Sequence, residues 1–413
     1  MKYAVVTFGC RVNQADSLAI EADLAARGAE AVPAASADVI VVNTCSVTAS
    51  ADQGARQTIR RLARENPGAR IVATGCYASR ASAEVEALPG VAVVVPNSRK
   101  SPAAVVAAAG IDTRAPQPAP LWSDGPCGRP PGPGLMGRTA WTMRVQTGCE
   151  EQCSYCVIPS TRGPSRSRSL DDVAAECDVV LDAGYREIAL AGVHLGSYGR
   201  DLAPASSLAA LLDTVSPRVA AAGARLRISS LEPMDCTPAV VERLATGPFA
   251  AHLHLPLQHA SDTVLARMAR PYTCAEYAAL VSHVRARMPH AAIGSDVLVG
   301  FPGETAREFG ELTDYLESSP LTHLHVFPYS ERPGTAASRL GGRVDGAEVK
   351  ARAARVREIS RVLQARFRAA QAGATRPALV IDDGTVAVTD NYIRVPLASP
   401  QPRGLIIDVV IPD

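Results

Sequence analysis

The sequence has no run of 18 apolar residues, so no segment has the composition of a membrane-spanning helix. It also has little net charge, because 42 lysines and arginines are balanced by 41 acidic residues to give +1 at pH 7. A global electrostatic signature of nucleic-acid binding is therefore missing, and any such partner must be met by a local patch. Residues 1–6 read as the start of a strand and not as a secretory signal, so we expect a cytoplasmic protein with no membrane partner.

The sequence is long, rich in apolar residues and contains several cysteines. Its 413 residues are too many for one ordinary core and indicate two or three domains. A hydrophobic content of 47% allows a sizeable core and excludes wholesale disorder. Disulfides are rare in the cytoplasm, so the ten cysteines favour metal or redox chemistry over structural crosslinks.

The first 100 residues alternate short apolar runs with helical stretches, a pattern that predicts an α/β domain with a parallel sheet. The expected strands span residues 3–8, 39–42, 70–74 and 91–95, and the expected helices span residues 14–27, 49–65 and 79–88. Residues 101–138 then become rich in proline and glycine, which weaken helix and strand alike. We interpret this range as a linker.

A second strand–helix series occupies residues 139–347. Candidate strands span residues 142–146, 187–191, 226–230, 252–256, 293–299 and 323–327. A helix over residues 170–183 is expected to be capped by Ser169, with Asp172 at the third position. Six such units predict a partial (βα)6 barrel and not a full eightfold one. Residues 348–372 read as one long helix within a basic segment that extends to residue 376, and residues 377–413 read as a short, incomplete β module.

Three cysteines lie close together in one loop after the first expected barrel strand. They follow CxxxCxxC spacing, at Cys149, Cys153 and Cys156. A short loop of this kind can place three thiolates on a cubane and leave the fourth iron open for a substrate. A zinc loop is the alternative, but zinc usually takes a fourth local ligand, and the next cysteine downstream, Cys177, falls in an expected helix. The spacing therefore favours an iron–sulfur cluster.

Three other cysteines share a position relative to three expected parallel strands. Each follows its strand by a few residues, at Cys10, Cys45 and Cys76. The carboxyl ends of parallel strands meet at one crevice, so we expect these thiols to converge and Gly9 and Gly75 to allow tight turns beside a bulky cofactor. Ordinary buried cysteines are the alternative. No such relation holds for the remaining cysteines, and packing is the better interpretation for one of them, Cys177.

With these motifs the sequence resembles the radical S-adenosylmethionine (SAM) methylthiotransferases over almost its whole length. The loop resembles the signature of radical SAM enzymes, including the aromatic residue before its last cysteine. The three dispersed cysteines resemble the second cluster site of the subfamily. The resemblance implies one 4Fe-4S cluster on Cys149, Cys153 and Cys156, and an auxiliary 4Fe-4S cluster on Cys10, Cys45 and Cys76. It also implies that the short β module corresponds to the family's RNA-binding, TRAM-like domain.

The family has three branches, and several runs here look most like the threonylcarbamoyladenosine branch. These runs occupy residues 9–14, 43–48, 74–77, 192–199, 227–233 and 325–330. That branch implies insertion of sulfur and methyl at C2 of threonylcarbamoyladenosine at position 37 of a transfer RNA. A departure occurs at His259 and Ala260, where the family usually has a small residue and glycine; these larger side chains are expected to narrow a loop on the cofactor side.

The implied chemistry replaces an aromatic C–H bond that acid–base residues alone cannot activate, so a cofactor must supply the reactivity. By the resemblance, one cluster reduces SAM to release a carbon radical, the second supplies sulfur, and a second SAM supplies the methyl group. An electron donor such as flavodoxin or ferredoxin and a sulfur source are implied partners. Candidate SAM contacts combine backbone approach and polar side chains, at Tyr155, Gly192, Ser229, Glu232, Val299 and Gly300.

Phosphate neutralisation dominates nucleic-acid affinity, so local basic surface marks where RNA is expected. Arg162, Arg166 and Arg168 closely follow the cluster loop and are candidate RNA contacts beside the active site. A second candidate is the segment 343–376, which has nine basic and three acidic residues; a solvated helix face explains it equally well. From Pro377 onward the balance reverses, with two basic and five acidic residues, which argues against phosphate binding by the β module.

Other functions remain compatible with the residues. The enzyme could act on isopentenyladenosine in transfer RNA or on a ribosomal protein. A non-catalytic iron–sulfur protein that carries electrons or senses redox state would need no open iron. A zinc-stabilised RNA-binding protein would contain no iron.

Overall fold

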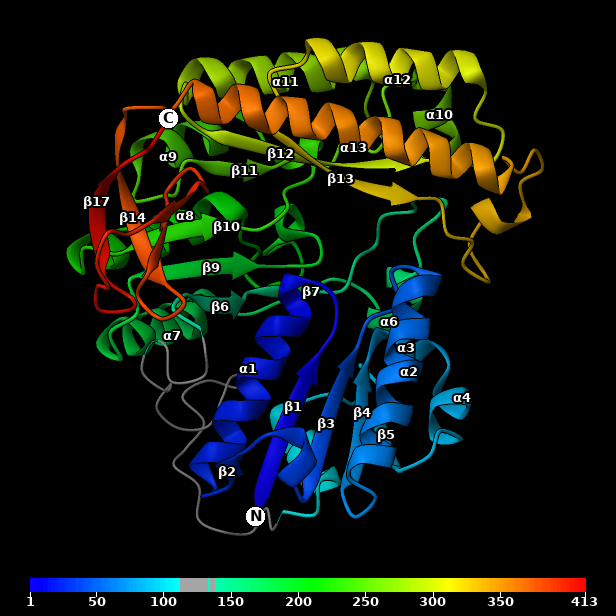
Figure 1. Cartoon of the computed structure of the whole chain (residues 1–413), viewed down its shortest axis with the longest axis vertical. Coiled ribbons are helices and arrows are strands. Elements are labelled where there is room, and N and C mark those ends of the chain that lie inside the picture. Colours follow the sequence, from blue (N-terminus) through cyan, green and yellow to red (C-terminus); the bar gives the residue numbers. More distant parts are fainter. Residues whose placement is uncertain (112–132, 134–137) are drawn as a thin grey trace.

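The computed structural model describes residues 1–111, 133 and 138–413 (Figure 1). Most of the predicted proline- and glycine-rich linker, including Cys127, lies outside the described residues. The chain forms an N-terminal parallel sheet, a partial barrel, and a long helix followed by a small C-terminal sheet. This is the α/β architecture that the sequence predicts. No helix in the described ranges is long and apolar enough to cross a membrane.

The N-terminal sheet has the strand order β2-β1-β3-β4-β5, with every pair parallel. Its strands are β1 (Lys2–Thr7), β2 (Glu30–Ala31), β3 (Val39–Thr44), β4 (Arg70–Gly75) and β5 (Val91–Val95). Its helices are α1 (Arg11–Ala26), α2 (Ala49–Glu65), α3 (Cys76–Arg80), α4 (Ser82–Glu86) and α5 (Pro102–Ala108). All residues of β3 are buried, as expected for a central strand covered on both faces. The helix predicted over residues 79–88 is in fact two short helices, and Cys76 begins the first of them.

Helix α5 corrects the predicted start of the linker. Ser101 caps it by accepting a hydrogen bond from the Ala104 amide at 3.1 Å, and Pro102 occupies the first turn, where its missing N–H costs nothing. Val105 and Val106 are fully buried in a core that also contains Leu24 of α1. The first part of the 101–138 range therefore belongs to the N-terminal domain, because its valines pack against α1.

The barrel contains six parallel strands, in two three-stranded sheets ordered β6-β9-β10 and β11-β12-β13. The strands are β6 (Trp141–Arg144), β9 (Glu187–Ala191), β10 (Arg225–Ile228), β11 (His252–His254), β12 (Ala292–Val299) and β13 (His323–Pro328). A parallel bridge between Leu226 and Phe249 joins the two sheets. The predicted six-stranded partial barrel is therefore confirmed.

Helices cover the outer face of the barrel. They are α7 (Leu170–Asp182), α8 (Leu208–Ala221), α9 (Pro238–Thr246), α10 (Asp262–Arg267), α11 (Cys274–Arg287) and α12 (Ala306–Ser318). Ser169 caps α7 by accepting from the Asp172 amide at 3.1 Å, as predicted. Ile293 and Val297 of β12 belong to the apolar core on the helix side. Since side chains alternate along a strand, Asp296 and its counterparts on the other strands face the barrel interior.

Helix α13 (Gly346–Ala369) runs along β13 and beside α12, and it leads into the C-terminal sheet (Figure 1). This antiparallel sheet has the order β16-β15-β14-β17, formed by β14 (Thr375–Ile381), β15 (Val386–Thr389), β16 (Arg394–Pro396) and β17 (Ile406–Val410). Arg225, the first residue of β10, donates hydrogen bonds to the carbonyls of Pro377 and Val388 at 3.1 and 3.0 Å. The C-terminal sheet therefore lies against the end of the barrel where β10 begins.

Candidate active site

The CxxxCxxC loop follows the short strand β7 (Gln146–Thr147), and backbone geometry sets its path. Gly148 has φ +76°, and a Cβ atom there would lie 1.8 Å from the Pro164 carbonyl oxygen, so only glycine fits. The Cys149 amide donates to the Gly163 carbonyl at 3.1 Å, and the Cys156 amide donates to the Cys153 carbonyl at 3.0 Å. These contacts curl the loop so that its three cysteines share one region.

The three thiols interact electrostatically and are free of disulfides. Burial, together with the neighbouring Cys153 and Cys149, raises the pKa of Cys156 to about 12. Burial also raises the pKa of Cys153, against the attraction of Arg270. A metal must therefore displace thiol protons in order to bind, which is how a cysteine cluster site normally forms.

Arg270 is a site residue that sequence reasoning missed. It is buried, donates to Cys153 Sγ at 3.1 Å and to the Tyr272 hydroxyl at 3.1 Å, and forms an ion pair with Glu232. The guanidinium thus links the first cluster loop to a residue predicted to contact SAM. No spacing rule could have found it, because Arg270 follows α10, more than a hundred residues beyond the loop.

The candidate SAM contacts Ser229, Tyr155 and Gly192 differ in their surroundings. Ser229 Oγ is buried and has no hydrogen-bond partner among the described residues, so it is available to a polar ligand. Tyr155 packs edge-on against Phe301, with ring centroids 6.5 Å apart. A Cβ atom at Gly192 would lie 3.0 Å from Gln146 Oε1, so this turn is closely packed. This buried hydroxyl directly after β10 fits a bound polar cofactor.

Val299 and Gly300, two further predicted SAM contacts, have hydrogen-bond partners within the protein. The Val299 carbonyl accepts from the Tyr329 amide at 2.8 Å, and the Gly300 amide donates to Glu304 Oε2 at 2.6 Å. A Cβ atom at Gly300 would lie 2.5 Å from a methyl group of Val349, so packing against α13 explains the glycine. These two backbone groups have partners within the protein, and contact of Val299 and Gly300 with SAM stays a prediction.

His259 is also placed differently from the prediction. Its side chain is fully buried and accepts a hydrogen bond from the Ser261 amide at 3.0 Å. Its Nε2 atom lies 3.9 Å from a carboxylate oxygen of Glu304. The imidazole therefore packs into the protein interior beside Glu304.

His194 is a second residue that the sequence analysis did not single out. It is buried, and its Nε2 atom lies 2.7 Å from Asp235 Oδ2. Burial lowers its pKa, but hydrogen bonds to Asp235 and Cys149 outweigh burial and raise the pKa to about 10. The signal that the sequence offered for His194 was its place in the run 192–199, one of the runs that resemble the threonylcarbamoyladenosine branch. A cationic imidazole beside Cys149 suits a negatively charged thiolate cluster.

The dispersed cysteines converge as predicted at the carboxyl ends of β1, β3 and β4. Gly9 and Gly75, which precede two of them, have φ values of +92° and +94°. A Cβ atom on Gly9 would lie 2.6 Å from Cys45 Sγ, which shows how closely the first and second loops approach. Burial raises the pKa of Cys45 to about 11, with further contributions from Cys76 and Cys10. The three thiols thus form one cluster of side chains.

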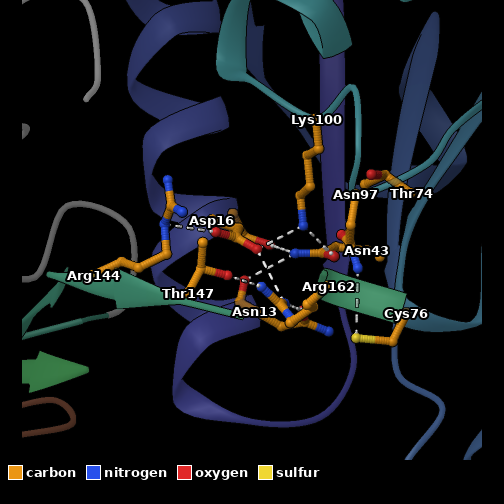
Figure 2. A network of polar contacts seen from close by, with 12 residues as sticks. Asn13, Asp16, Asn43, Thr74, Cys76, Asn97, Lys100, Arg144, Thr147 and Arg162 are labelled. Atoms are coloured by element: carbon orange, nitrogen blue, oxygen red, sulfur yellow. Dashed lines mark hydrogen bonds and ion pairs between the residues drawn. The ribbon is translucent and has the colours of Figure 1, made fainter. Parts of the chain in front are cut away.

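A buried polar network joins this cluster of cysteines to the barrel domain (Figure 2). Arg162, in helix α6 (Ile158–Arg162) after the first cluster loop, donates to Asn13 Oδ1 at 2.5 Å and lies 3.3 Å from Asp16 Oδ2. Lys100 donates to the same Asp16 oxygen at 2.7 Å. Burial would lower the pKa of Arg162, but Cys76 and Asp16 raise it, so the guanidinium is charged and faces the auxiliary cysteines.

Two of the three arginines predicted to contact RNA are corrected. Arg162 is buried in the network just described. Arg168 is also buried, forms an ion pair with Glu176 and donates to the Arg144 carbonyl at 3.2 Å. Buried guanidinium groups with internal carboxylate partners are not available to phosphates. Arg166, in strand β8 (Arg166–Ser167), is exposed and stays a candidate contact.

Only some of the basic residues in segment 343–376 are exposed and therefore available to contact RNA. Arg352 is buried against Glu304, and Arg376 is paired with Asp390. Its exposed basic residues are Arg343, Lys350, Arg355, Arg357, Arg361 and Arg366. RNA contact by these residues stays a prediction.

Comparison with known proteins agrees with this geometry. A family profile described as "Uncharacterized protein family UPF0004" matches residues 2–96, and one described as "Radical SAM superfamily" matches residues 143–316. The structure of the radical SAM methyltransferase TsrM from Kitasatospora setae aligns with a TM-score of 0.57, covering 81% of this chain and 76% of that one. At 17% identity this similarity supports the fold alone.

Curated relatives come from all three branches of one enzyme family. The chain is 38% identical over 352 residues to the threonylcarbamoyladenosine tRNA methylthiotransferase MtaB of Bacillus subtilis, covering 82% of this chain and 76% of the relative. It is 36% identical to the ribosomal protein uS12 methylthiotransferase RimO of Roseiflexus sp., covering 82% and 77%. It is also 36% identical to the tRNA-2-methylthio-N(6)-dimethylallyladenosine synthase of Frankia alni, covering 86% and 72%.

The partial parallel barrel and its three-cysteine loop define a radical SAM enzyme, which uses an iron–sulfur cluster and SAM. With the N-terminal domain and the relatives added, the chain belongs to the radical SAM methylthiotransferase family.

Proposed function

We propose that this chain is a transfer RNA methylthiotransferase that modifies C2 of threonylcarbamoyladenosine at position 37. The observation that carries the proposal is the pair of three-cysteine sites, one in the single loop after β7 and the other at the carboxyl ends of β1, β3 and β4, connected by Arg162. One site suits a 4Fe-4S cluster that binds SAM, and the other suits an auxiliary 4Fe-4S cluster. The branch is supported by the sequence runs around the auxiliary cysteines and by relatives such as the Bacillus subtilis enzyme.

Cys149, Cys153 and Cys156 would hold the first cluster, and Cys10, Cys45 and Cys76 the second. When bound, these groups supply one-electron reduction, sulfur and methyl transfer, which the side chains alone cannot provide. Arg270 orients Glu232 beside Cys153, and Ser229 offers a free hydroxyl for the polar end of SAM. An external electron donor such as flavodoxin or ferredoxin and a source of sulfur complete the proposed system.

The test uses anaerobically reconstituted protein, a reductant, and SAM with a labelled methyl group. Three substrates are compared: transfer RNA with threonylcarbamoyladenosine, transfer RNA with isopentenyladenosine, and the ribosomal protein. Label is expected in the nucleoside fraction of the first substrate alone. Label in either of the others would assign the chain to a different branch.

A matched variant separates the roles of the two sites. Cys10→Ala, Cys45→Ala, Cys76→Ala triple substitution is expected to preserve reductive SAM cleavage and to abolish methylthiolation. A variant that still incorporates sulfur at the wild-type rate would contradict the role of the auxiliary site. An unchanged cluster spectrum on addition of SAM to wild type would favour the electron-transfer protein instead.

A further inference from the structure

Four histidines face the interior of the barrel on two of its strands. His252 and His254 lie on β11, and His323 and His325 lie on β13, each pair separated by a leucine. Strand β12 lies between them and contributes Asp296, which pairs in register with His325. The rings contact one another: the His254 and His325 centroids are 5.1 Å apart, and those of His252 and His323 are 5.9 Å apart. Neither cysteine site includes these side chains.

The side chains of His254, Asp296 and His325 converge at their ligand atoms. His254 Nε2 lies 3.0 Å from Asp296 Oδ1, and His325 Nδ1 lies 3.3 Å from the same oxygen. All three ligand atoms lie within 4.8 Å of one another, and the described residues contain no other group of three histidine, cysteine or carboxylate ligands this close together. Two imidazoles and one carboxylate are a common donor set for first-row divalent metals.

The surroundings of His254 indicate an available lone pair. The side chain is 9% exposed, and its Nδ1 atom lies 2.7 Å from Ser230 Oγ. Its Nε2 atom is buried and has no well-aligned hydrogen bond to the described residues, although Asp296 is close. A metal-ligating histidine typically uses its second ring nitrogen for a hydrogen bond that fixes the ring, as Ser230 does here.

The access to the group also suits a cation. His325 is largely exposed and lines a pocket of about 360 Å³ between β13, α13 and the C-terminal sheet. The exposed ring of His325 and the partly exposed carboxylate of Asp296 give an ion access to the group from solvent.

We propose that His254, Asp296 and His325 form a binding site for one first-row divalent cation, such as manganese, iron or zinc. Three protein ligands leave coordination positions open to water or to an anionic ligand in the barrel interior. The site uses nitrogen and oxygen donors and is separate from the thiolate sites. It does not depend on the proposed methylthiotransfer, and its failure would leave that proposal intact.

The test titrates Mn²⁺ into anaerobically reconstituted protein and follows the electron paramagnetic resonance signal of free Mn²⁺. Both clusters in their oxidised state are diamagnetic and do not obscure this signal, and manganese disfavours thiolates. We expect about one bound Mn²⁺ per chain and its release by Zn²⁺, which binds the same donors more tightly. Asp296→Asn and His254→Gln should abolish this binding, and Ser230→Ala should weaken it about 10- to 100-fold.

His283→Gln, which removes an exposed histidine on α11, is the matched control and should bind as wild type does. Iron content and circular dichroism establish that each variant is folded and loaded. Saturable binding that is lost only in the site variants supports the proposal. Absence of binding in wild type, or equal binding in wild type and Asp296→Asn, would overturn it.

Discussion

Arg162 Nη2 donates a hydrogen bond to Asn13 Oδ1 at 2.5 Å and thereby joins the barrel domain to the N-terminal sheet. Arg162 follows the first cluster loop by a few residues, and Asn13 follows Cys10 by three. The same Asn13 side chain donates to the carbonyls of Phe8 and Thr44, which flank two auxiliary cysteines. A single buried arginine therefore fixes the relative positions of the loops that carry the two sites.

Asp16→Asn is expected to destabilise the protein by about 3–5 kcal/mol, because it leaves the buried Arg162 and Lys100 without their shared carboxylate. The measurement is the shift of the urea unfolding midpoint. Glu65→Gln, which breaks an exposed pair with Arg61, is the control and should change stability by less than about 1 kcal/mol. Equal midpoints for both variants would show that the network does not support the fold.

Iron content should report two independent cysteine sites. Reconstituted wild type is expected to bind about eight irons per chain, and triple alanine substitution of either cysteine set should leave about four. Iron and sulfide analysis of anaerobic protein measures this directly. About four irons in wild type, all lost when Cys149, Cys153 and Cys156 are replaced, would mean that the dispersed cysteines hold no cubane.

Arg270→Gln should weaken SAM binding, because Glu232 and Cys153 lose the guanidinium that orients them. We expect affinity to fall about 10- to 100-fold while the iron content is retained, by analogy with residues that orient metal ligands. The change that SAM causes in the resonance spectrum of the reduced cluster gives the affinity. Arg270→Lys should restore part of it, whereas the exposed Arg287→Gln should have no effect. Full SAM affinity in Arg270→Gln would refute this role.

Stability should fall as the pH is lowered, partly because of His259. Burial lowers the pKa of this imidazole from 6.5 to about 3. Below pH 6.5 the unfolded chain binds a proton that the folded chain does not, so unfolding is favoured by up to about 1.4 kcal/mol per pH unit. His259→Gln should flatten the dependence of the urea midpoint on pH between about pH 7 and about pH 5. His283→Gln, on the surface, should leave the wild-type slope, and an unchanged slope in His259→Gln would contradict the assignment.

The sequence by itself determined the elements and the two sets of cysteines. The alternation of strand and helix patterns predicted the positions of β3, α2 and β9. This was possible because the spacing of apolar residues that marks a buried strand or helix is a local property of the sequence. The position of Cys10, Cys45 and Cys76 after three parallel strands predicted their convergence, since topology brings those strand ends together. The helix that contains Val105 and Val106 was not predicted, because the nearby alanines and prolines resemble a linker. This short helix is stabilised by packing on α1.

Only the tertiary structure decided which polar residues serve the site. Arg162 and Arg168 have the composition of an RNA-binding patch, but carboxylates from α1 and α7 enclose them. Arg270 and His194 approach Cys153 and Cys149 from distant segments, which no spacing reveals. The His254, Asp296 and His325 group likewise depends on the register of three neighbouring strands. Long-range contacts between ionic side chains are set by how the strands and helices pack, and a local sequence pattern does not encode them.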